Sequence, residues 1–83
     1  MTRTDFHLHL ERRDHQRNMA RFYALQVERD MFGTWLATRR WGRIGSIGRT
    51  ESIPCRTPAE AVAHLKDLAT RKTRRGYIPL KDL

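Results

Sequence analysis

Polar and apolar residues alternate in two segments of the first half of the chain, the pattern of strands that bury one face. The segments are 4–11 and 21–30. Their apolar faces consist of Phe6, Leu8 and Leu10 in the first and Tyr23, Leu25 and Val27 in the second. The segment that follows the first strand, 12–18, is entirely polar. We therefore predict two β-strands joined by a loop.

The next part of the chain predicts two more strands, with less regular alternation. Gly33 permits a positive φ and marks a hairpin turn that leads into an antiparallel third strand over 35–44. Both faces of this strand mix apolar and charged residues. A bulge near Gly42 would resolve the conflict, because glycine inside a strand often marks one. After a tight turn at 45–48, we predict a fourth strand over 49–55.

The pattern then changes to helical spacing. Thr57 can cap a helix, Pro58 suits the first helical position and Glu60 can close a capping box. An apolar stripe follows, which consists of Ala61, Val62, Leu65, Leu68 and Ala69. We predict a helix that ends near Arg75, with Gly76 as its terminator.

Together these elements predict an α+β fold, in which an antiparallel sheet of about four strands packs against one C-terminal amphipathic helix. The length of 83 residues suits a single domain, 1–83. Pro79 prevents further helix. The residues expected to pack back onto the core are Tyr77, Ile78 and Leu80. Since no apolar run or signal peptide is visible, we expect a cytoplasmic protein that does not contact membranes.

Charge is the strongest compositional signal. The chain has 17 lysines plus arginines against 9 aspartates plus glutamates, a net charge of +8. The only lysines are Lys66, Lys72 and Lys81. Arginine binds phosphate bidentately and stacks on flat rings, so this bias favours nucleic acid as the partner. Because an ordinary solvated basic surface has the same composition, charge alone argues for it only weakly.

Cysteine and histidine do not indicate a metal or catalytic site. Cys55 is the single cysteine, so we interpret it as a small buried hydrophobe. His7 and His9 form a His-x-His pair with His15 nearby, but they lie on a polar strand face without an identifiable third ligand, and solvent exposure is the simpler interpretation. No catalytic triad, carboxylate pair or nucleotide loop is recognisable. We expect no metal, no cofactor and no enzymatic activity.

The sequence Arg40-Trp41-Gly42-Arg43 resembles the motif of the WGR domain, a family named after this Trp-Gly-Arg triplet. The other matching features are the aromatic strand 21–27, the turn 32–35, the alanine-rich helix 59–68 and the basic run 71–77 that ends in Gly-Tyr. The resemblance covers nearly the whole chain.

WGR domains occur beside the catalytic domain of poly(ADP-ribose) polymerases and also in small bacterial proteins. In the polymerases, the domain contacts DNA at a strand break, its tryptophan packs on the sugar of a terminal nucleotide and its arginine bridges to neighbouring domains. The resemblance therefore implies a bacterial DNA-binding module in which Trp41 contacts DNA. It makes Arg43 a bridging or phosphate-contacting group.

The residues that we expect to bind nucleic acid are Trp41, Arg43, Arg40, Arg39, Arg71, Lys72, Arg74 and Arg75. Tryptophan in a strand is usually core, but the flanking arginines favour an exposed ring. Those arginines have an alternative as well, pairing with Glu28 or Asp30 across the hairpin. The last four cations also complement the helix dipole, which requires no ligand. Gly42 serves the backbone, through a close approach or a bulge.

Two functions remain open from the sequence. The first is a non-catalytic nucleic-acid-binding module, for DNA in preference to RNA, with a preference for ends, nicks or junctions. The alternative is a protein-interaction adaptor whose basic face docks an acidic partner or a separate enzyme. The sequence contains no signal for an oligomeric state.

Overall fold

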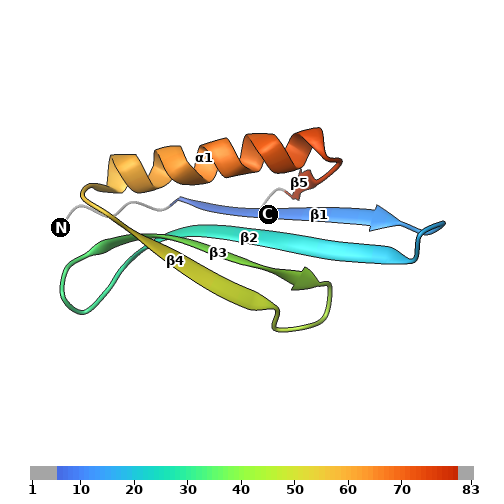
Figure 1. Cartoon of the computed structure of the whole chain (residues 1–83), viewed down its shortest axis with the longest axis horizontal. Helices are drawn as coiled ribbons and strands as arrows, with labels where there is room; N and C mark the ends of the chain where they lie inside the picture. The colour runs from blue at the N-terminus through green and yellow to red at the C-terminus, as the bar shows by residue number, and fades with distance from the viewer. Residues whose placement is uncertain (1–5, 81–83) are drawn as a thin grey trace.

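The computed structural model describes residues 6–80, which form a five-stranded sheet with one helix across it (Figure 1). The elements are β1 (His7–Asp14), β2 (Met19–Arg29), β3 (Trp35–Arg43), β4 (Arg49–Cys55), α1 (Pro58–Arg74) and β5 (Ile78–Leu80). The strand order is β4-β3-β2-β1-β5, and every neighbouring pair is antiparallel. The predicted α+β fold is confirmed.

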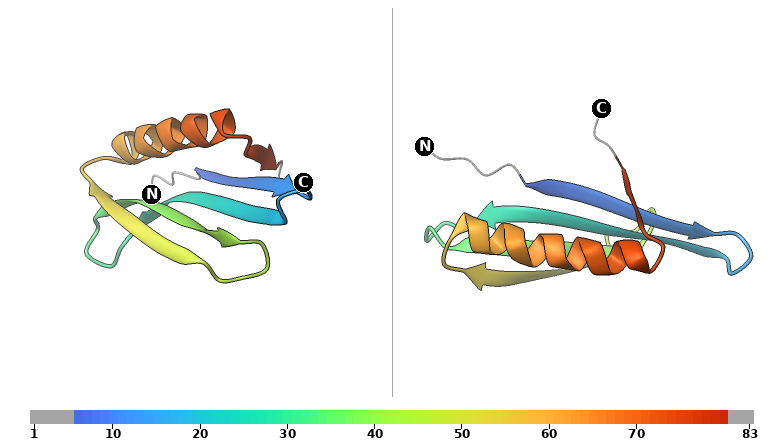
Figure 2. Two further views of the ribbon diagram at one scale, coloured as in Figure 1. Left: turned by 45° about the vertical axis from the view of Figure 1, so that its right-hand side comes forward. Right: turned by 90° about the horizontal axis from the view of Figure 1, so that it is seen from above.

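The helix covers one face of the sheet and leaves the other open. The views in Figure 2 show α1 lying along the length of the sheet, and it packs against β3, β2 and β4. The residues buried between the two layers are Leu10, Tyr23, Leu25, Val27, Ala37, Cys55, Ala61, Leu65, Leu68 and Tyr77. Leu10 and Leu25 have no exposed surface. Within residues 6–80, no helix combines the length and apolar character needed to cross a membrane.

Both ends of α1 form as their sequence signals predict. The Thr57 side chain accepts the Glu60 N–H at 3.1 Å. The Glu60 carboxylate accepts the N–H of Arg56 at 3.2 Å, so the reciprocal bond of the capping box falls one residue before the cap. At the other end, Gly76 has a φ of +97° and ends the helix directly before the buried Tyr77.

The prediction of a loop over 12–18 is wrong for its first half. β1 continues to Asp14, and only the residues from 15 to 18 form the turn. The polar residues 12–14 pair with β2 because a ladder needs backbone groups and not apolar side chains. The predicted start of this strand at residue 4 lies outside the described residues.

The predicted bulge near Gly42 is wrong as well. β3 pairs with β2 in one uninterrupted register from Trp35 to Arg43. Gly42 instead permits a close approach, because a Cβ there would lie 2.9 Å from the Cα of Gly48 in the following turn. The alternative prediction for this glycine, a close backbone approach, is therefore the one that the structure supports.

β5 is the strand that the sequence analysis did not predict. It pairs with β1, with Leu80 opposite His9 and Ile78 opposite Glu11. Tyr77 packs on the core as expected, but Ile78 and Leu80 remain 65% and 44% exposed. Backbone pairing at the sheet edge, and not burial of their side chains, holds these two residues.

Candidate nucleic-acid interface

Three aromatic rings form a continuous cluster at the end of the sheet where α1 ends. Trp41 stacks on Tyr23 of the neighbouring strand, with ring centroids 6.1 Å apart and an interplanar angle of 12°. Tyr77 meets Tyr23 edge-on at 5.3 Å. Both tyrosines are buried, whereas Trp41 is only half-buried. Trp41 is therefore the outermost ring of the three. It packs on Tyr23, and part of its surface remains accessible to solvent.

Two cations lie over these rings. The guanidinium carbon of Arg39 is 4.6 Å from the centroid of Trp41, and the Nζ of Lys72 is 4.5 Å from the centroid of Tyr23. Such contacts are attractive because the face of an aromatic ring is electronegative. Arg39 also pairs with Glu51, with 2.9 Å between its Nη2 and the carboxylate. The cluster thus holds positive charge directly against its rings.

A row of three arginines continues the same face beyond the rings. The register places Arg12 opposite Arg21 and Arg21 opposite Arg43. Because residues two apart in a strand share a face, Arg21 lies on the side of Tyr23 and Arg43 on the side of Trp41. Neighbouring strands are about 4.8 Å apart, so the row spans about 10 Å of the sheet.

The three rings, with Arg21 and Arg43 of this row, line a cavity of about 390 Å³. The residues that line it are Arg17, Asn18, Met19, Ala20, Arg21, Phe22, Tyr23, Trp41, Gly42, Arg43 and Tyr77. Among residues 6–80, no carboxylate contributes to this lining. Burial raises the pKa of Tyr77, while the nearby charges of Arg21 and Arg12 act in the opposite direction. The cavity therefore combines an aromatic floor, phenolic hydroxyls and cationic walls.

The structure separates Arg40 from the other strand arginines. Its neighbours along the chain face α1, so Arg40 lies on the open face of the sheet. There its Nη1 donates to the carbonyl of Ile47 at 2.8 Å, and its guanidinium lies 4.8 Å from the ring centroid of Phe22. These contacts hold the turn between β3 and β4.

The four cations predicted at the end of α1 have different surroundings. Lys72 reaches the aromatic cluster through its contact with Tyr23. Arg71 pairs with Asp67 at 3.3 Å and lines a separate groove between α1 and the strands β3 and β4. The remaining two, Arg74 and Arg75, are exposed where the helix ends. Only Lys72 among the four touches the rings in the described contacts.

The acidic residues proposed as alternative partners of the strand arginines have other contacts. Glu28 accepts a hydrogen bond from the Thr38 hydroxyl at 3.0 Å. Asp30 accepts the N–H groups of Phe32 and Thr34, each at 2.9 Å, and so organises the hairpin turn. Arg39 forms its ion pair with Glu51 on the other neighbouring strand.

Sequence reasoning did not single out Arg12, Arg21 or Tyr77 for this interface. Period-two alternation places Arg12 on the face of Leu10 and Arg21 on the face of Tyr23. It does not show that the two arginines are neighbours on adjacent strands. Their juxtaposition depends on strand register, which is a long-range property. Away from this interface, residues 6–80 contain one group of side chains able to ligate a metal, at the opposite end of α1.

Comparison with known proteins gives one family and one relative. A family model described as "WGR domain" matches residues 6–82. The chain is 40% identical over 78 residues to the uncharacterized protein y4dW of Sinorhizobium fredii (strain NBRC 101917 / NGR234). This match covers 94% of the chain but 38% of the relative, so the chain spans well under half of the relative's length. No solved structure matches the chain significantly.

Proposed function

Because the chain belongs to the WGR domain family, a family linked to nucleic-acid binding, we propose that it is a non-catalytic module that binds DNA and prefers ends, nicks or junctions. The observation that carries this proposal is one cavity in which the accessible part of Trp41 meets Arg21 and Arg43. A terminal nucleotide offers the matching chemistry, with a sugar or base for the ring and phosphates for the guanidinium groups.

The size of the cavity supports recognition of an end. A volume of about 390 Å³ lies at the small end of the range for sites that enclose a small molecule. It suits one nucleotide-sized group and not a stretch of duplex. Inside a continuous duplex, stacking hides the flat faces of the bases, so only an end, a nick or an unpaired junction presents a group of this kind.

The arginines supply affinity in this proposal, and the ring supplies selectivity. Arg21 and Arg43 line the cavity, where bidentate contacts to phosphate are favourable. Arg39 is already paired with Glu51, so a phosphate must compete with that carboxylate for it. Lys72, Arg74 and Arg75 extend the positive surface at the end of α1. Arg40, on the other face, serves the turn that it contacts.

The test compares two tryptophans on the same strand face. Trp35 resembles Trp41 closely, since it is half-buried and lies under an arginine, with the Arg29 guanidinium 5.0 Å from its centroid. We expect Trp41→Ala to weaken binding to nicked or blunt-ended DNA by about 1–3 kcal/mol, the range for a stacking aromatic. Trp35→Ala should leave this binding unchanged. Both variants are measured at a temperature at which each is folded.

The DNA substrates separate end recognition from charge. Trp41→Ala should change binding to a closed circle little, because phosphate contacts dominate there. Arg43→Ala should weaken binding to open and closed DNA alike. Equal losses for Trp41→Ala on both substrates, with the fold intact, would leave only general electrostatic binding, which is also the behaviour of an adaptor for an acidic protein.

A further inference from the structure

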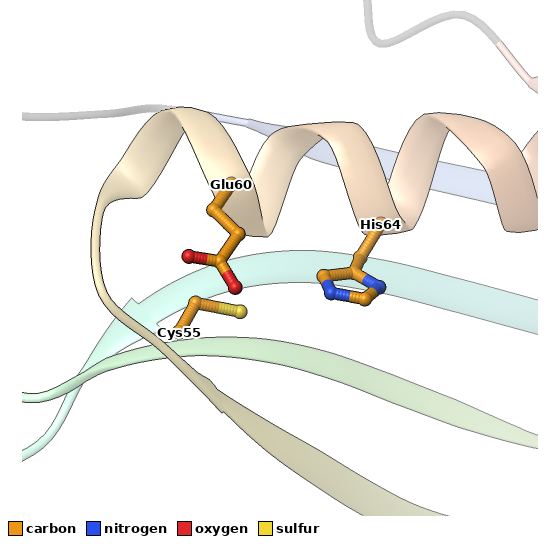
Figure 3. Close-up of side chains that lie close together, drawn as sticks. All are labelled: Cys55, Glu60 and His64. Atoms are coloured by element: carbon orange, nitrogen blue, oxygen red, sulfur yellow. The ribbon is translucent and has the colours of Figure 1, made fainter.

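Three side chains of different chemistry come together where β4 ends and α1 begins (Figure 3). They are Cys55, Glu60 and His64, and their possible ligand atoms all lie within 4.8 Å of one another. Glu60 and His64 are four residues apart, so they share one face of the helix. β4 delivers Cys55 to that face, just before the helix cap.

We propose that this cluster is a binding site for a divalent transition metal, with Zn²⁺ as the preferred ion. Thiolate, carboxylate and imidazole are the three protein ligand types of zinc, and they leave the fourth tetrahedral position to water. Ligand atoms around tetrahedral zinc are about 3.3–3.7 Å apart, so the side chains need to close by about 1 Å. Glu60 and His64 are exposed, so they can rotate inward without disturbing the core.

The charge of the cluster suits a doubly charged ion. An ionised Cys55 and Glu60 contribute two negative charges, and a neutral His64 completes the set. This balance is necessary because both the positive chain and the positive end of the helix dipole oppose a cation at this position. Ca²⁺ and Mg²⁺ prefer oxygen ligands, and two of the three ligand atoms here are sulfur and nitrogen, so the cluster discriminates against them.

The surroundings already orient two of the ligands. The N–H of Arg56 donates to one carboxylate oxygen of Glu60 at 3.2 Å, which leaves the second oxygen for a metal. Cys55 is 7% exposed, and its thiol donates to the carbonyl of Ile53 at 3.5 Å. This is a weak bond that metal coordination would replace at little cost.

Metal binding would join β4 to the first two turns of α1 and so stabilise the docking of the helix. The site is distant from the proposed DNA interface, because Cys55 pairs with Trp35 at one end of β3 and Trp41 is near the other end, about 20 Å away along the strand. The two proposals are therefore independent, and each is tested without the other.

The experiment titrates the reduced, metal-free chain with Co²⁺ as a spectroscopic probe, followed by competition with Zn²⁺. We expect one equivalent of Co²⁺ to produce a thiolate-to-metal charge-transfer band and the visible bands of a tetrahedral ion, and Zn²⁺ to abolish both. Zn²⁺ should also raise the Tm. Cys55→Ser should remove the charge-transfer band, and Glu60→Gln and His64→Ala should each weaken binding at least about tenfold. His15→Ala, in the turn after β1, is the matched control and should bind normally.

Three results would overturn the proposal. The first is the absence of a charge-transfer band in the wild-type chain. The second is unchanged metal affinity in Cys55→Ser. The third is unchanged affinity in both Glu60→Gln and His64→Ala, whose exposed positions let the fold survive substitution.

Discussion

The turn that follows the Trp-Gly-Arg motif packs closely against the backbone of the motif. Alanine substitutions at three glycines can separate the free energy lost through this close contact from that lost through an unfavourable backbone conformation. Gly45 has a φ of +94°, but an added Cβ would meet nothing within 4 Å. Gly42 has no positive φ, but its Cβ would meet Gly48 at 2.9 Å and the hydroxyl of Ser46 at 3.3 Å. Gly48 combines both constraints.

The structure gives an order for the three alanine variants. In Gly45→Ala, the only cost is that of placing alanine at a left-handed φ, which lowers the free energy of unfolding by about 1–2 kcal/mol. In Gly42→Ala, the only cost is the steric overlap of the new methyl group with the turn, and overpacking of this kind typically costs about 1–3 kcal/mol. In Gly48→Ala, with a φ of +75°, the methyl group would overlap the Trp41 carbonyl and lie 3.1 Å from the Phe22 ring. Its cost should therefore reach about 2–5 kcal/mol, the two terms together.

Urea unfolding followed by tryptophan fluorescence measures these differences. A domain of this length has a total stability of about 4–12 kcal/mol, so Gly48→Ala should remove a large part of it. Each kcal/mol lowers the Tm by about 4–8 °C in a domain of this size, so thermal melts give an independent ranking.

The ranking itself is the result that could refute this reasoning. If Gly48→Ala is no more destabilising than Gly45→Ala, the turn does not press on the Trp41 backbone as described. If Gly42→Ala is neutral, the motif glycine is not required for this approach. In the folded fraction, Gly42→Ala should also weaken binding to DNA ends, because it displaces the strand that presents Trp41.

Two further predictions concern packing and charge. Leu65→Ala should lower the free energy of unfolding by about 2–5 kcal/mol, since this side chain is 2% exposed beneath the helix, and an unchanged melt would contradict the docking of α1. If about 3–5 phosphates are contacted, log Kd against log salt on duplex DNA should have a slope of magnitude about 3–4.5. Replacement of Arg12, Arg21 or Arg43 by glutamine should each reduce that magnitude by about 1, whereas Arg40→Gln should affect unfolding and leave the slope intact.

Local signals in the sequence were sufficient for the helix and for most strands. The cap at Thr57, the proline after it and the terminator Gly76 fixed α1 to within about one residue, because each acts on its own turn. β5 escaped prediction because a three-residue strand with a central proline has no periodicity of its own. It exists only because the free edge of β1 lies beside it. The bulge prediction failed because Arg39 lies over Trp41, which lets a charged residue occupy the covered face.

The candidate interface was predictable in its ring but not in its set of arginines. The motif identified Trp41 and Arg43, which do line one cavity. Neighbouring residues in a strand point to opposite faces of the sheet. Because Trp41 and Arg43 lie on the face that α1 covers, Arg40 lies on the other face and does not line the cavity with them. Arg12 comes to lie opposite Arg21, and Arg21 opposite Arg43, only through strand register. Whether these groups bind DNA stays a prediction.

The pairing of β5 with β1 also determines how this domain can be carried by a longer polypeptide. Leu80 lies opposite His9, only two residues from the start of β1 at His7, so β1 begins and β5 ends at the same edge of the sheet. One strand spacing and two residues of rise separate these points by about 8 Å. The segment from β1 to β5 could therefore be inserted at one surface position of a larger protein. Such an insertion would need no long linker and would not separate the parts of that protein on either side of it.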